Sequence, residues 1–85
     1  LPDTTTAVVL KPDGKRAYAY HPTAGGILVY DISVVRDEAA YAALGAVVPL
    51  TGDPGAGVRM AITPDGGTLF LAGAAQIVVQ PTPAL

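Results

Sequence analysis

His21 has the most versatile chemistry in this sequence, and it is the single histidine of the 85-residue chain. An imidazole acts as a general base or a metal ligand when carboxylates, hydroxyls or further ligands lie beside it. Its neighbours in sequence are Tyr20 and Pro22, and the spacing supplies no such group. We therefore predict that His21 is a residue without a catalytic role, in a loop or at the rim of the fold where a strand ends.

The acidic residues could in principle supply acid-base or calcium chemistry. Asp13 and Asp65 each lie inside a Pro-Asp-Gly segment, so they belong to two copies of one turn and do not form a convergent pair. Four other acidic residues lie outside any D-x-D-x-D-G calcium loop: Asp31, Asp37, Glu38 and Asp53. The chain has no cysteine, which excludes disulfides and thiolate sites, and we expect no metal and no cofactor.

The glycine-rich segment 52–57 resembles a phosphate-binding loop in composition alone. No Gly-Lys-Ser/Thr follows it, and residues 58–63 have a strand-like pattern, so no helix N-terminus would face a phosphate. The formal net charge is −2, and Lys15-Arg16 is the one pair of adjacent basic residues. Nucleic acid is therefore not an expected partner.

A repeated segment indicates which elements position these residues. Residues 8–19 match residues 60–71, and each copy has the pattern of a strand, a turn and a strand. The turns consist of Pro12, Asp13 and Gly14 in the first copy and of Pro64, Asp65 and Gly66 in the second. Proline fixes φ, aspartate bonds back to the turn backbone and glycine accepts positive φ, so each copy is predicted to be an antiparallel hairpin.

Further strands are predicted after each hairpin. The apolar runs 27–32 and 76–80 predict a third strand in both copies, and residues 46–51 predict a fourth strand in the first copy. Pro49 cannot donate a ladder hydrogen bond, so this fourth strand is expected at a sheet edge. Apolar residues at both alternations predict sheets covered on both faces, with aromatic residues packed between them: Tyr18, Tyr20, Tyr30, Tyr41 and Phe70.

Four antiparallel strands followed by a loop to a new first strand are the plan of a β-propeller blade. The interval between the two turns exceeds the roughly 40 to 50 residues of an ordinary blade, which predicts an insertion at residues 33–45. Residues 37–44 are rich in helix formers, have acids in their first turn and stop at Gly45, so a short helix is expected there. This helix has two interpretations. It is either a recognition helix on the rim or, as we favour, a connector that rests Tyr41 and Leu44 on its own blade.

The predicted fold is all-β, with about two four-stranded antiparallel blades of a β-propeller in an incomplete ring. Residues 7–51 form the first blade and 58–80 a partial second blade; residues 1–6 are a linker or partial strand, and 81–85 are a linker. The chain is 51% hydrophobic and 14% charged, which leaves little polar surface for a small globule. We therefore expect further blades as partners, from the same chain or from other copies. Glycine, glutamine and proline interrupt the uncharged stretch 66–85, so no membrane span is predicted.

The repeated Pro-Asp-Gly turn, followed by an apolar strand and a third strand that ends at Asp31, resembles the YVTN-type β-propeller repeat proteins over residues 7–80. The resemblance implies a bacterial scaffold in the periplasm, at the cell surface or secreted. Similar blades occur in lactonase-like and quinoprotein-like enzymes, so the pattern specifies architecture and not chemistry. The sequence departs from it in the loop 22–26 and at Gln80, which replaces Asp31 in the second copy.

Two functions fit these observations. The first is a non-catalytic propeller scaffold that binds a protein or glycan through rim loops, with Tyr20, His21 and Tyr41 as candidate contacts. The alternative is part of a lactonase-like or quinoprotein-like enzyme whose active site lies outside this stretch. Several copies could also assemble into one ring. The lack of a convergent polar cluster favours the scaffold, and catalysis by this stretch is not expected.

Overall fold

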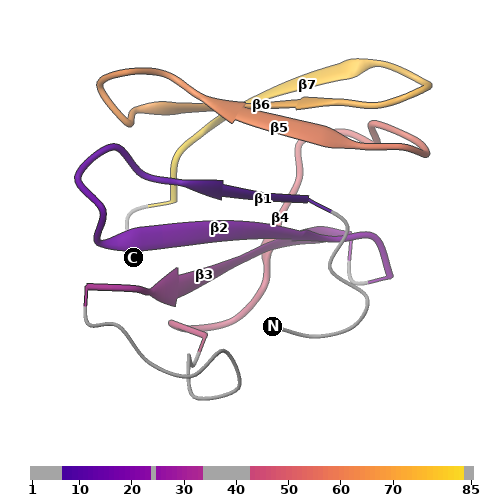
Figure 1. Ribbon diagram of the computed structural model, residues 1–85. Coiled ribbons are helices and arrows are strands. Elements are labelled where there is room, and N and C mark those ends of the chain that lie inside the picture. Colours follow the sequence, from indigo (N-terminus) through magenta and orange to yellow (C-terminus); the bar gives the residue numbers. More distant parts are fainter. Residues whose placement is uncertain (1–6, 24, 34–42, 84–85) are drawn as a thin grey trace.

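The computed structural model describes residues 7–23, 25–33 and 43–83, and all regular elements in these ranges are strands. The first sheet contains β1 (Ala7–Leu10), β2 (Arg16–His21), β3 (Gly26–Asp31) and β4 (Val48–Pro49). The second sheet contains β5 (Arg59–Ile62), β6 (Thr68–Ala72) and β7 (Ile77–Pro81). Both sheets are antiparallel, with the strands in sequence order, and one is stacked on the other (Figure 1). The predicted all-β class is confirmed for the described residues.

The repeated sequence forms the same arrangement in both sheets. Tyr18 of β2 pairs with Val29 of β3, and Phe70 of β6 pairs with Val79 of β7. Tyr18 and Phe70 therefore hold equivalent positions, and Val29 is equivalent to Val79. We call the side of each sheet that bears Tyr18 or Phe70 its front face, and the opposite side its rear face.

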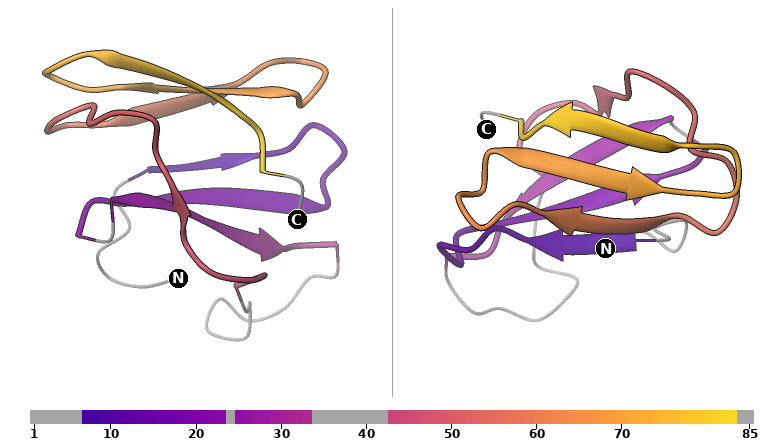
Figure 2. Two further views of the ribbon diagram at one scale, coloured as in Figure 1. Left: turned by 180° about the vertical axis from the view of Figure 1, so that it is seen from behind. Right: turned by 90° about the horizontal axis from the view of Figure 1, so that it is seen from above.

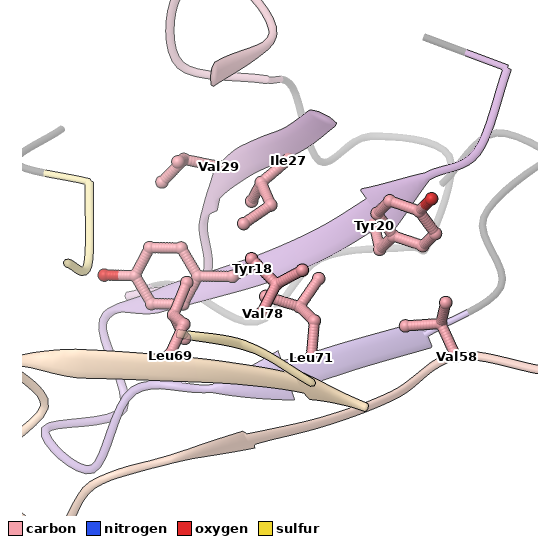
Figure 3. Close-up of a cluster of buried hydrophobic side chains, with 8 residues drawn as sticks. All are labelled: Tyr18, Tyr20, Ile27, Val29, Val58, Leu69, Leu71 and Val78. Atoms are coloured by element: carbon pink, nitrogen blue, oxygen red, sulfur yellow. The ribbon is translucent and has the colours of Figure 1, made fainter. Parts of the chain in front are cut away.

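The main core lies where the front face of the first sheet meets the rear face of the second. Because side chains alternate along a strand, each strand presents every second residue to this core. None of its eight side chains is more than 8% exposed. They are Tyr18, Tyr20, Ile27 and Val29 from the first sheet, Leu69, Leu71 and Val78 from the second, and Val58 from the segment before β5 (Figure 3).

The two sheets differ in how their outer faces are covered. On the rear face of the first sheet, Ala17, Ala19 and Tyr30 form a second buried cluster, so β2 is buried on both sides. On the front face of the second sheet, Phe70 and Val79 are exposed. The described residues of this chain do not cover the front face of the second sheet, so the predicted cover on that face stays a prediction. Tyr18 and Tyr20 pack between the sheets as predicted, whereas Phe70 does not.

The sheets approach each other most closely at their first strands. Among the described strands, β1 and β5 are the pair from different sheets that lie side by side. The sheets diverge from this line toward β3 and β7, as Figure 1 shows. The segment before β5 runs from the first sheet to the second along one side of the stack (Figure 2, left).

The fourth strand of the first sheet is shorter than predicted. The sequence predicts residues 46–51, whereas β4 contains Val48 and Pro49 and pairs with β3 alone. The Leu50 amide donates to the Gly25 carbonyl (3.3 Å). Because backbone groups alternate in direction along an antiparallel strand, the nitrogen of the preceding residue, Pro49, faces away from β3. Proline therefore stands at an outer sheet edge, where its missing N–H removes no ladder bond.

The predicted helix at 37–44 lies largely outside the described residues. Its last two residues are described and are not helical: Ala43 bridges Tyr30, and the Leu44 amide donates to the Val29 carbonyl (2.7 Å). A helix therefore does not extend to Gly45. Hydrogen bonding to the free edge of β3 satisfies these backbone groups instead.

Val78 and Val79 provide a matched test of this packing, because they are adjacent valines on opposite faces of β7. Val78 is 4% exposed and Val79 is 55% exposed. Val78→Ala should lower the free energy of unfolding by about 2 kcal/mol, through lost apolar burial and a cavity. Val79→Ala should change it by less than about 0.5 kcal/mol. Urea denaturation of dilute protein measures both, and equal losses would contradict the assignment of the two faces.

Candidate functional site

The two Pro-Asp-Gly segments form matching turns. The Gly14 amide donates to the Lys11 carbonyl (2.9 Å), and the Gly66 amide donates to the Thr63 carbonyl (2.8 Å). Both glycines have positive φ, 74° at Gly14 and 75° at Gly66. Glycine adopts this conformation without the clash that a Cβ would cause, so both positions require it.

The turn carboxylates are used within their own turns. Asp13 Oδ1 accepts from the Lys15 amide, and Asp65 Oδ1 accepts from the Gly67 amide, both at 2.9 Å. Asp65 also accepts from the Thr63 hydroxyl (2.6 Å). The Thr63 hydroxyl, followed by the Gly67 amide, holds the pKa of the Asp65 carboxyl below its ordinary value of 3.8, because both stabilise the ionised form. Both carboxylates therefore stabilise their own turns.

The fold brings the two turns to the same end of the stack. A Cβ built on Gly66 would lie 3.2 Å from Lys11 Cε and 3.5 Å from Pro12 Cδ. The first turn thus rests against the second through the Lys11 side chain. This contact between the copies is tertiary, so the local sequence pattern does not predict it.

The expected rim contacts do not form an exposed group. Tyr20 and His21 lie at the end of β2, and each is 4% exposed. Tyr20 belongs to the core between the sheets. Tyr41 lies outside the described residues. In this structure Tyr20 and His21 are therefore packing residues and offer no surface to a partner.

The other acidic residues that the structure describes also serve local structure. Asp31 Oδ1 accepts from the Ser33 hydroxyl (2.7 Å) and pairs with Arg16 (3.3 Å). Asp53 Oδ1 accepts from the Gly55 amide (2.9 Å). No group of three or more potential metal ligands occurs among residues 7–23, 25–33 and 43–83.

Buried tyrosine hydroxyls do not supply a base either. Burial raises the pKa of Tyr18 above its ordinary value of 10.0, and the negative charge of Asp13 raises it further, against a smaller opposing effect of Arg16. Burial likewise raises the pKa of Tyr30. Desolvation disfavours the phenolate, so both side chains stay neutral at physiological pH.

Gln80 has a structural role that the sequence comparison missed. Its side chain is 5% exposed; Oε1 accepts from the Thr51 amide (3.1 Å), and Nε2 donates to the Pro49 carbonyl (3.2 Å). The amide thus holds the segment after β4 against the second sheet. Asp31 pairs with Arg16, and Pro81 pairs with Thr68, the repeat equivalent of Arg16. Strand register therefore makes Pro81 the equivalent of Asp31. The predicted equivalence of Gln80 and Asp31 is therefore wrong by one residue.

The most distinctive surface of the described chain is apolar. Phe70, Ile77 and Val79 on the front face of the second sheet are 37%, 66% and 55% exposed. Val8 and Leu10 of β1, which pair with Ala19 and Ala17 on the rear side of the first sheet, are 43% and 57% exposed. Large exposed apolar groups therefore lie at the two opposite ends of the stack. Where such groups form a contiguous patch, they are typical of interaction surfaces.

Thr63→Val tests the hydrogen bond that lowers the Asp65 pKa. We expect the NMR titration midpoint of the Asp65 carboxyl to lie below 3.8 and to move upward in this variant. Because the pKa is lower in the folded state, the stabilisation is present above the unfolded value and is lost as pH falls through the folded one. The unfolding free energy of Thr63→Val should accordingly depend less on pH in this acidic range. Thr23→Val, in an exposed turn, is the control, and an unchanged Asp65 titration in Thr63→Val would contradict the assignment.

Comparisons with known proteins do not identify a relative of this chain. No family model matches it, and no curated protein and no solved structure matches it either. Among the described residues, no helix has the length and apolar character needed to cross a membrane.

Proposed function

We propose that this chain is a non-catalytic scaffold segment of the β-propeller kind, in which its sheets are consecutive members of a longer stack. The front face of the second sheet and the exposed rear side of β1 bind further sheets, and the exposed loops are the surface offered to a protein or glycan. The extracytoplasmic location implied by the family resemblance belongs to the same proposal.

This proposal depends on one observation: the front faces of the two sheets have apolar side chains at equivalent positions, but one face is buried and the other is exposed. Tyr18, Ile27 and Val29 on the front face of the first sheet are fully buried under the second sheet. Strand register places Phe70, Ile77 and Val79 at the same positions of the second sheet, where they are exposed. A face with this side-chain pattern is stable under another sheet, because burying each large apolar side chain contributes about 1.5–3 kcal/mol. The second sheet thus has the front face of a unit that another unit covers.

The rear end of the stack also has exposed apolar side chains, which supports assembly of the front face of one unit against the rear of the next. Val8 and Leu10 lie on the rear side of β1 and are exposed, whereas their repeat equivalents Met60 and Ile62 pack against the core. The stack therefore presents apolar side chains at its front end and at its rear end. A unit that binds front to rear generates a ring or an open array, depending on the rotation between units.

The divergence of the sheets favours a ring. β1 and β5 lie side by side, and the outer strands are farther apart (Figure 1). Repeating such a wedge places the first strand of every sheet near a common axis, which is the arrangement of blades in a propeller. The loops that would then face a ligand include the exposed turn residues Pro22 and Thr23, and not Tyr20 or His21.

Ile77→Lys tests whether the exposed front face binds another sheet. We expect the isolated 85-residue chain to self-associate weakly, with the front face of one copy against the rear of another. A lysine at this 66% exposed position adds a charge that association would have to desolvate. The dissociation constant for self-association of the Ile77→Lys chain should therefore rise by about tenfold or more, measured by light scattering over a concentration series.

Ala74→Lys is the matched control, because Ala74 is exposed in the turn between β6 and β7 and lies outside the front face. This variant adds the same charge and should associate like the original chain. Circular dichroism establishes that both variants retain the β-sheet fold. If Ile77→Lys and Ala74→Lys associate equally, the front face does not bind a sheet and the proposal fails.

A further inference from the structure

We propose that the outer edge of β7 is a strand-addition site, which binds an extended, uncharged, β-branched peptide segment in the antiparallel direction. This site uses backbone groups in the plane of the second sheet. It is therefore distinct from the front face, whose side chains project out of that plane, and it does not depend on the proposed stacking.

The hydrogen-bonding pattern shows which groups of β7 face outward. The Gly73 amide donates to the Gln76 carbonyl (3.1 Å), and the Thr82 amide donates to the Gly67 carbonyl (3.1 Å). Alternate residues between them, Val78 and Gln80, consequently direct their backbone groups toward β6. Ile77 and Val79 direct theirs away from β6.

No strand pairs with this side of β7 in the part of the chain that the structure describes, since the second sheet has the order β5-β6-β7. The right-hand view of Figure 2 shows β7 as the outermost strand of its sheet. An edge strand with unpaired N–H and C=O groups is a template for pairing with another chain. Pro81 limits the site, because it has no N–H to offer beyond Val79.

The first sheet shows what occupies the equivalent edge. Ile27 and Val29 of β3 correspond to Ile77 and Val79, and the chain bonds to both of them. Ile27 pairs with Val48 of β4, and the Val29 carbonyl accepts from the Leu44 amide. The edge of β7 therefore has the strand type and register of an edge that this chain already covers in its first sheet.

The chemistry of the surroundings defines the occupant. Residues 66–83 contain no charged side chain, and residues 46–51, which include β4, contain none either. Ile77 and Val79 are exposed beside the edge, so a bound strand would place its alternate side chains next to theirs. An uncharged segment with β-branched residues fits this environment, whereas a charged one would meet no opposite charge. Pairing of an extended peptide with a sheet edge is an established mode of recognition.

The test uses a capped peptide with the sequence of residues 46–51, added to the full chain. NMR hydrogen exchange should show the Ile77 and Val79 amides slowed by about tenfold when about nine-tenths of the protein is bound. The control peptide has the same side chains but is N-methylated at the residues that correspond to Val48 and Leu50, whose amides face the partner strand in the first sheet. This peptide should not protect Ile77 or Val79.

Two chain variants separate the edge from the side chains beside it. Ile77→Ala removes the side chain and keeps the amide, so peptide binding should persist. Ile77→Pro also removes the outward N–H but no bond to β6, so binding should be lost.

Equal binding of the N-methylated peptide would show that the peptide binds the apolar face, and it would overturn the proposal. The proposal also fails if no amide of β7 gains protection. Protection that rises with protein concentration in the absence of peptide, and that does so equally in Ile77→Lys, whose front-face association is weakened, would assign the edge to a second copy and would likewise overturn the proposal. The peptide controls remain decisive if Ile77→Pro does not fold.

Discussion

The stack of two sheets depends on the packing of one apolar face against another. Tyr18, Ile27 and Val29 meet Leu69, Leu71 and Val78 with almost no residual exposure. These side chains come from residues far apart in sequence, and no disulfide or metal site among the described residues joins the two sheets. Apolar burial is therefore the main force that holds the sheets together.

Close backbone approaches supplement this packing where the segment between the sheets meets them. A Cβ on Gly26 would meet the Val48 carbonyl oxygen, and a Cβ on Gly73 would meet that of Pro54. The Ala75 amide also donates to the Pro54 carbonyl (3.0 Å). Glycine at positions 26 and 73 thus allows the connecting segment to lie directly against β3 and against the turn that precedes β7. Side-chain packing and main-chain contact together set the separation of the two sheets.

The features that were predictable from the sequence are those with a local physical cause. The Pro-Asp-Gly turns, the hairpins that they join and the edge position of Pro49 follow from φ preferences and from the missing proline N–H. The burial of His21 and the exposure of Phe70 depend on what lies over each sheet, so strand alternation alone could not distinguish them. The amide of Gln80 bonds to residues about 30 positions earlier in the chain, a contact that no local pattern specifies. The burial of Tyr20 was not predictable for the same reason, because position in a strand does not reveal exposure.

The hydrogen bonds of Gln80 have a consequence for how the chain unfolds. The Pro49 carbonyl belongs to β4, the last strand of the first sheet, while Gln80 belongs to β7, the last strand of the second. Detaching β7 would leave the Pro49 carbonyl and the Thr51 amide without their partner, and detaching β4 would do the same to the Gln80 side chain. Loss of either strand thus weakens the other. The two sheets are thereby coupled into one cooperative unit, although each has its own hairpin and its own backbone ladder.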